Sequence, residues 1–269
     1  MGTIVSFHAH PDDEAIGSAG TLAKAAAAGH RVVLVFATRG ERGEPQPGVL
    51  ADGEQLSIRR SAECHESGAV LGAARVEFLG YVDSGMMGEP TNSEPFCFWQ
   101  APVEHAAKRL ALVLEEEEAD VVTIYDDNGG YGHPDHIQVH RVGKRAGALA
   151  GVPVVAQGTT NRDWLIRGLR SMKGGNLPEG WEPPEIPEDG SFGKPESEIT
   201  HRVEAVEFAE TKRASMRVHR SQIGPDHFML TMPEPIFAMG LGTEFYIVDE
   251  PPNPASAPDI WTELFVPLR

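Results

Sequence analysis

The sequence has no continuous run of 18 apolar residues, and its N-terminus lacks a basic segment followed by an apolar core. A membrane-spanning helix needs about 20 apolar residues, and a secretory signal peptide needs both of those N-terminal parts. We therefore expect no membrane span, no signal peptide and a cytoplasmic protein. Cysteine is also scarce: Cys64 and Cys97 are the only two, and they lack C-x-x-C spacing. We expect both to be free thiols, as is usual in a reducing compartment.

Basic residues are few relative to acidic ones. The chain has 23 Lys and Arg against 40 Asp and Glu, a formal net charge of −17 at pH 7. Such a surface repels phosphate backbones and anionic lipid, which argues against nucleic-acid and membrane partners. The G-x-G-x-x-G turn of dinucleotide-binding proteins is also missing after the first predicted strand, since Gly17 and Gly20 fall inside a predicted helix. The expected partner is a small molecule; the sequence gives no indication of the oligomeric state.

Strand and helix patterns alternate through the first 160 residues. Strands are predicted at residues 3–8, 31–37, 76–79, 121–125 and 152–156, and helices at 14–28, 56–71, 103–118 and 134–150. Nearly continuous apolar runs such as RVVLVFA at 31–37 are typical of parallel strands covered on both faces. The fold class predicted for residues 1–160 is therefore α/β, a Rossmann-like three-layer sandwich with a mostly parallel sheet that carries the catalytic site.

The composition changes after residue 160. Residues 161–200 are rich in proline and glycine and predict an irregular, loop-rich insertion that serves as a lid or specificity element. Its aromatic residues Trp164 and Trp181 could stack on a sugar ring or pack within the loop. Residues 201–269 predict a smaller C-terminal α+β portion of the same domain, with a helix at 202–218 and short β segments at 228–248.

Two histidine–aspartate segments follow predicted parallel strands: HPDDE at residues 10–14 and YGHPDH at 131–136. Open α/β sheets bind their ligands at the carboxyl ends of such strands. A catalytic zinc site uses three N or O ligands and leaves one position for water. The sequence predicts that His10, Asp13 and His136 hold one Zn²⁺, although other divalent transition metals are possible. A single HPD could instead start a helix with Asp as its N-cap, but two such segments favour a metal.

The remaining side chains of these segments are candidates for catalysis. Asp12 could take the proton of a metal-activated water as the general base. His133 could donate to the leaving nitrogen or steady the oxyanion, and Tyr131 could hydrogen-bond the same oxygen. Asp135 could orient His133 or couple to its charge.

The two segments resemble the LmbE-like family of zinc-dependent deacetylases, which includes the GlcNAc-PI de-N-acetylases (PIG-L) and the bacterial deacetylases and amidases of mycothiol metabolism. The resemblance continues in the loop at residues 37–44 and in short segments at 60–63, 83–86 and 219–222. It implies the same ligands and base, and a His133 that balances charge in the tetrahedral intermediate. It also implies that Arg60 and Asp83 hold substrate hydroxyls or phosphate, with Glu44 at the lip of the site.

The predicted reaction is hydrolysis of an N-acyl group, typically acetyl, from an amino sugar or related glycoside. An amidase acting on a larger thiol conjugate or natural-product scaffold is the alternative within enzymes. A catalytically silent carbohydrate-binding protein is the alternative outside them. Three further histidines leave a choice open: His8, His140 and His219 could contact the metal or substrate, or could be satisfied core residues.

Overall fold

The computed structural model describes residues 1–173, 187 and 189–268. Eight strands form one sheet in the order β3-β2-β1-β4-β5-β7-β6-β8. Five of them, β3 to β5 in that order, are parallel, and the other three are antiparallel additions at one edge. The strands are β1 (Thr3–His8), β2 (Arg31–Phe36), β3 (Arg75–Phe78), β4 (Val121–Tyr125), β5 (Val154–Thr159), β6 (His201–Glu204), β7 (Thr243–Ile247) and β8 (Val266–Pro267).

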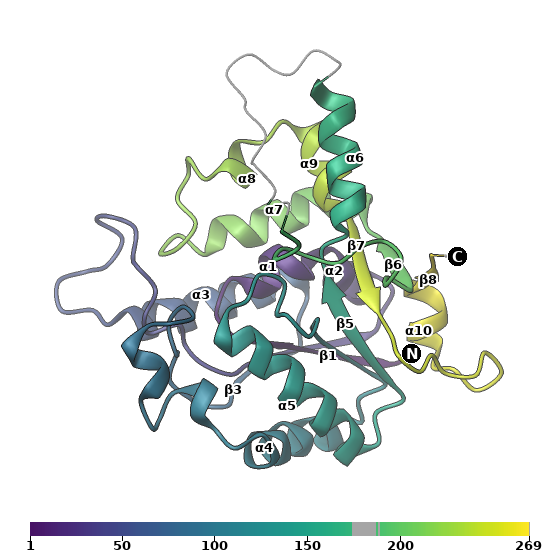
Figure 1. Cartoon of the computed structure of the whole chain (residues 1–269), viewed down its shortest axis with the longest axis horizontal. Coiled ribbons are helices and arrows are strands. Elements are labelled where there is room, and N and C mark those ends of the chain that lie inside the picture. The colour runs from purple at the N-terminus through teal and green to yellow at the C-terminus, as the bar shows by residue number, and fades with distance from the viewer. Residues whose placement is uncertain (174–186, 188, 269) are drawn as a thin grey trace.

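Helices cover both faces of this sheet (Figure 1). Successive residues of a strand point to opposite faces, so Ile4 packs in one core with Leu22, while Val5 packs in the other with Leu110. The predicted three-layer α/β fold is therefore confirmed. The helices are α1 (Asp13–Gly17), α2 (Ala19–Ala27), α3 (Leu56–Leu71), α4 (Val103–Glu116), α5 (Pro134–Ala150), α6 (Arg162–Lys173), α7 (Ala209–Val218), α8 (Phe228–Thr231), α9 (Glu234–Leu241) and α10 (Asp259–Leu264); three short 3₁₀ helices lie at Pro90–Ser93, Phe98–Gln100 and Val206–Phe208.

The helix predicted at residues 14–28 is two helices, because the chain leaves helical geometry at Ser18. The Ser18 hydroxyl donates to the Glu14 carbonyl oxygen at 3.4 Å and lies 3.3 Å from Nε2 of His8. This break limits α1 to five residues, Asp13–Gly17, at the end of the HPDD segment. The sequence pattern alone does not show it.

Three predictions for the C-terminal half are wrong. Residues 162–173 form the helix α6 rather than irregular chain, because the Asn161 side chain accepts the Trp164 N–H at 2.9 Å and caps its first turn. The helix predicted at 202–218 begins as strand β6, and only 209–218 is α-helical. The β segments predicted at 228–248 are α8 and α9 followed by one strand, β7; prolines near the start of α9 suit a first helical turn. Trp181 lies outside the described residues.

The structure bears on two sequence expectations, those for membrane-spanning helices and for the cysteines. None of the helices in residues 1–173 and 189–268 is both long and apolar enough to cross a membrane. Cys64 and Cys97 are buried and unpaired, as predicted.

Candidate metal centre and catalytic site

The two histidine–aspartate segments meet at the carboxyl edge of the sheet. Strands β1 and β4 are parallel neighbours, with Ile4 opposite Val121, so the loops that follow them begin at the same edge of the sheet. The Asp13 carboxylate lies between the rings of His10 and His136. One of its oxygens is 3.6 Å from Nδ1 of His10, and the other is 3.4 Å from Nε2 of His136. The three predicted ligands are thus neighbours in the fold.

The backbone of the first segment is strained at Asp12. Its φ of 105° lies in the left-handed region, which a non-glycine residue rarely adopts. Three contacts hold it there: Glu14 accepts the Asp12 N–H at 3.0 Å, and the Arg60 guanidinium donates to the Pro11 carbonyl and to the Asp12 carboxylate, the latter at 3.1 Å. Strain of this kind is typical of functional sites, where the surroundings fix an otherwise unfavourable geometry.

Hydrogen bonds to outer partners decide which ring nitrogen of His10 and of His136 faces Asp13. His136 directs Nδ1 to the Gly129 carbonyl at 3.2 Å, so Nδ1 carries the proton and Nε2 keeps its lone pair. His10 directs Nε2 to the Asp135 carboxylate at 3.2 Å, and its Nδ1 faces Asp13 at 3.6 Å. Outer partners of this kind commonly orient histidine ligands of metals. Nδ1 of His10 and Nε2 of His136 therefore face the same carboxylate.

Burial and neighbouring charges give these groups forms that suit a cation. Burial, reinforced by His10, lowers the pKa of His136 and favours its neutral form. Burial raises the pKa of Asp13, but His136 and His10 outweigh it and hold that pKa well below its usual range. Burial lowers the pKa of His10, but Asp83, Asp13 and Asp135 outweigh it and hold that pKa well above its usual range, so His10 has to release a proton when a cation binds. An ionised carboxylate with imidazole nitrogens is a donor set that zinc and similar divalent metals accept. The residues present fit the group that the sequence predicts.

Among the residues that the structure describes, two sets of buried side chains offer ligand atoms within 4.8 Å of one another. One is His10, His133 and His136, and the other is His10 with Asp83 and Asp135. His10 and His136 are therefore common to the predicted site and to the first set, whereas His133 was expected to act in catalysis. His133 also caps α5: its Nδ1 accepts the Asp135 N–H at 3.1 Å, which leaves Nε2–H free to donate.

The pKa values of the two candidate acid–base residues are shifted in opposite directions. Burial raises the pKa of Asp12 to about 6, with Arg60 opposing the rise and Asp13 adding to it. Burial, together with His10 and His136, lowers the pKa of His133 to about 4. At neutral pH, Asp12 is an ionised proton acceptor and His133 a neutral donor. Pairs of groups whose pKa values are separated in this way are typical of acid–base sites.

Asp135 has a different partner from the one expected. Its buried carboxylate accepts from the Ser84 N–H at 2.9 Å, from the Ser84 hydroxyl and from His10, while only its backbone N–H reaches His133. The Asp135 carboxylate therefore orients His10 and reaches His133 only through its charge, which raises the pKa of His133 against the larger effect of burial. The reason is that Asp135, at the start of α5, faces the loop after β3, which the sequence pattern does not place.

The predicted substrate residues lie at different depths. Arg60 is buried against Asp12, and Asp83 is buried with Oδ1 3.5 Å from Nε2 of His10. Tyr131 is 47% exposed, with its hydroxyl 3.5 Å from Nε2 of His136. Glu44 is exposed on the loop after β2. The structure thus brings Arg60, Asp83 and Tyr131 to the cluster.

The three undecided histidines have other partners. His8 contacts Ser6 at 2.7 Å and the Tyr125 hydroxyl at 3.0 Å. His140 directs Nδ1 to the Tyr125 carbonyl at 3.0 Å, and His219 contacts Glu14 at 2.5 Å. None of the three belongs to the ligand-distance sets found among the described residues.

Tyr125 is a site residue that the sequence analysis missed. Its ring stacks on His136, with centroids 4.5 Å apart, and its hydroxyl accepts the Ala9 N–H at 3.2 Å. It therefore links the ends of β1 and β4 beneath the cluster. The available signal was its position as the last residue of the strand that precedes the second segment.

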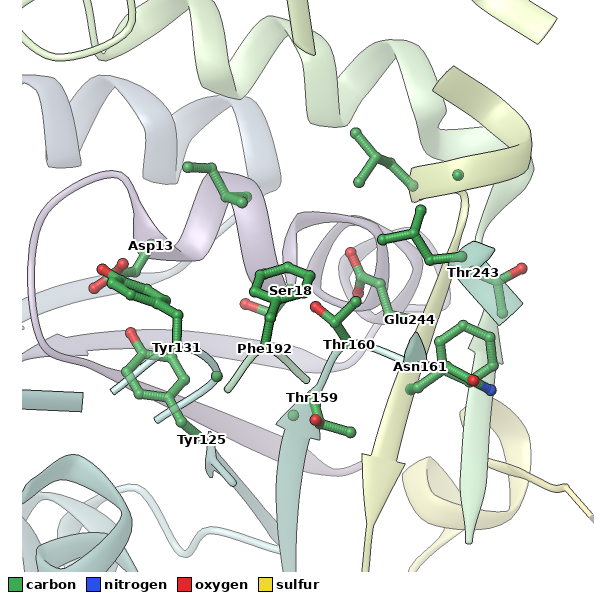
Figure 2. A pocket seen from close by; sticks show the side chains of 18 of the residues that line it. Asp13, Ser18, Tyr125, Tyr131, Thr159, Thr160, Asn161, Phe192, Thr243 and Glu244 are labelled. Atoms are coloured by element: carbon green, nitrogen blue, oxygen red, sulfur yellow. The ribbon is translucent and has the colours of Figure 1, made fainter. Parts of the chain in front are cut away.

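A cavity of about 650 Å³ opens from this cluster. Asp12, Asp13, Tyr131 and His136 line it at the cluster, and its other walls include residues of α1, β4, β5, β7, α6, α7, α8 and α9. In Figure 2, Asp13 and the two labelled tyrosines lie together at one end, and Asn161, Thr243 and Glu244 at the other. A cavity of this size is typical of small-molecule sites.

The fold and the site define an open α/β protein with a buried histidine–carboxylate cluster able to hold a metal ion, placed where such sheets bind ligands. Residues 5–147 match the family described as PIG-L, GlcNAc-PI de-N-acetylase. The chain belongs to this family, and the predicted resemblance is confirmed.

Curated relatives extend the similarity beyond the matched region. The chain is 38% identical to a 1D-myo-inositol 2-acetamido-2-deoxy-alpha-D-glucopyranoside deacetylase of Thermobifida fusca (strain YX), over 97% of this chain and 98% of the relative. A deacetylase of the same description from Nocardiopsis dassonvillei is 42% identical, over 80% of this chain and 83% of the relative. The similarity to the first relative therefore spans nearly the full length of both chains.

Solved structures share the fold at low identity. An N,N'-diacetylchitobiose deacetylase from Pyrococcus horikoshii superposes with a TM-score of 0.60 at 22% identity, covering 92% of this chain and 83% of that one. The 4-carboxy-2-hydroxymuconate hydratase GalB from Pseudomonas putida superposes with 0.59 at 16%, covering 94% and 98%. Because a deacetylase and a hydratase share this fold, the fold alone does not decide the reaction.

Proposed function

We propose that the chain is a metal-dependent hydrolase that removes the N-acetyl group from an amino-sugar glycoside. The observation that carries the proposal is the Asp13 carboxylate between His10 and His136, with the strained Asp12 beside it. The deacetylase relatives support the substrate class, since the similarity covers nearly the whole chain.

His10, Asp13 and His136 would hold the ion, through Nδ1, the carboxylate and Nε2. A bound Zn²⁺, or another divalent transition metal, polarises the amide carbonyl and acidifies a water molecule. The donor set favours zinc by ligand type. His133 lies within ligand distance of both histidines but faces them through a nitrogen that can donate, so we assign it to the reaction rather than to the ion.

The other side chains provide proton transfer and orientation. Asp12 accepts a proton from the attacking water, because its carboxylate is ionised at neutral pH. The Nε2–H of His133 donates to the developing oxyanion or to the leaving nitrogen, and the Tyr131 hydroxyl donates to the same oxygen. Arg60 holds Asp12 in place, and Asp83 and Glu44 are candidates for substrate hydroxyls.

Metal analysis combined with turnover of an N-acetylglucosaminyl glycoside tests the proposal. Asp12→Asn should keep the metal content of the wild type and lower turnover by roughly 10²- to 10⁴-fold. Asp13→Ala and His136→Ala should lower the metal content itself, and Asp127→Ala, an exposed aspartate, is the matched control. Full metal occupancy in both ligand variants would refute the ligand assignment, and unchanged turnover in Asp12→Asn would refute the base.

A further inference from the structure

The cavity beside the cluster is much larger than an acetyl group and mostly apolar. Its lining includes Leu165 and Leu169 of α6, Met229 of α8 and Ile236 and Leu241 of α9. At about 650 Å³ it lies well within the ~300–1,000 Å³ of sites that hold drug-sized ligands. An acetyl methyl group would leave most of it unfilled by substrate.

Several polar groups on these walls already have partners inside the protein. Glu244 accepts from Gly20, Thr21 and the buried Lys212, and the Thr159 hydroxyl donates to Asp126. The Asn161 side chain likewise accepts the Trp164 N–H, and the Tyr246 hydroxyl lies 2.8 Å from that of Thr21. The cavity therefore offers little to sugar hydroxyls and much to hydrocarbon.

Two charged side chains that contact the cluster, Arg60 and Asp83, lie outside the cavity lining. Arg60 and Asp83 contact Asp12 and His10 but are not among the described residues that line the cavity. In a trans amide, the acyl chain and the substituent on nitrogen leave the C–N bond in opposite directions. With the carbonyl at the cluster, a hydroxyl-rich ring on the charged side directs the acyl chain into the apolar side.

We propose that this cavity is an acyl-chain subsite, and that the enzyme hydrolyses amino sugars with N-acyl chains longer than acetyl at least as well as N-acetyl ones. The proposal rests on the proposed function, because it needs the amide carbonyl at the cluster. In Figure 2 the lining side chains extend from Asp13 and Tyr131 past Phe192 toward Asn161, so a linear chain that follows the cavity leads away from the metal ligands. Each buried methylene strengthens binding roughly fourfold, which makes chain length a sensitive probe.

The test compares kcat/KM for N-acetyl-, N-butyryl- and N-hexanoylglucosamine with the metal-loaded full chain, detecting the free amine. We expect the hexanoyl to acetyl ratio to reach about 10 or more. Leu165→Trp and Gly240→Leu should each lower that ratio about tenfold by occupying the cavity. A Cβ at Gly240 meets no heavy atom within 4 Å, so this second variant is expected to fold. Leu112→Trp, at a 67% exposed position of α4, is the control that should leave the ratio unchanged.

The outcomes separate the two proposals. A wild-type kcat/KM that falls steadily from acetyl to hexanoyl, with acetyl hydrolysed normally, overturns the acyl subsite and leaves the deacetylase intact. A rate increase with an octyl N-acetylglucosaminide but not with longer acyl chains also overturns it, because the cavity then holds the aglycone. If none of these amides is hydrolysed, the proposed function fails and the subsite fails with it.

Discussion

Replacing Lys212 by methionine should lower the free energy of unfolding by about 3–5 kcal/mol, because it leaves a buried carboxylate without its cation. The side chains of Lys212 and Glu244 are 2% and 4% exposed, and their charged atoms are 2.6 Å apart. Glu244 also accepts from the backbone of Gly20 and Thr21 and from the Thr21 hydroxyl, at 2.6–2.9 Å. These neutral donors remain in the variant but do not balance the charge.

The loss is large against a typical total of about 5–15 kcal/mol. Urea unfolding followed by circular dichroism should show the midpoint falling by roughly 1–1.7 M, for a slope of about 3 kcal/mol/M. The double variant Lys212→Met/Glu244→Gln should recover most of the loss, since no buried charge is left unpaired. Lys108→Met, which breaks the exposed pair with Glu104, should leave the midpoint unchanged. A loss under about 1 kcal/mol in Lys212→Met, or no recovery in the double variant, would refute the reasoning.

Three further predictions concern the site. The value of kcat/KM should fall as the pH drops through about 6 or somewhat lower, because the active form of Asp12 is ionised and its pKa in the folded protein is about 6. A bound cation favours the ionised form and so moves this fall to lower pH. A flat profile from pH 7.5 to 4.5 would contradict the prediction. Gly129→Ala should reduce metal content and turnover, because a Cβ there lies 2.4 Å from that of His136 and the φ is +61°, whereas Gly17→Ala, with no atom within 4 Å, should do neither. Removing metal with a chelator should abolish turnover, and adding Zn²⁺ back should restore it; full activity of metal-free protein would exclude a metal-dependent reaction.

Much of the fold follows from local patterns. The five parallel strands lie within three residues of their predicted positions at every end, because apolar runs covered on both faces are distinct from their surroundings. The later part was harder to predict, since α6 depends on the cap that Asn161 provides and β7 depends on an edge supplied by β5. The cap is a single residue directly before the helix, whereas the β5 edge lies more than 80 positions before β7 in the sequence.

The site divides in the same way. The segments HPDDE and HPDH, each after a buried strand, were sufficient to name His10, Asp13 and His136 as neighbours, because adjacent parallel strands end at one edge. Residues that act on these ligands from other elements could not be named this way. Tyr125 and Ser84 became visible only in the fold, since their contacts cross 11 to 116 positions of sequence.

By itself, the sequence determined the class of chemistry, because the donor atoms are encoded in two short segments whose strands are self-evident. The tertiary structure decided what surrounds those donors. It determines which nitrogen of each histidine faces Asp13, that the Asp135 carboxylate contacts His10, and how large and apolar the adjoining cavity is. These properties depend on distances between elements far apart in the chain, and packing rather than local pattern sets such distances.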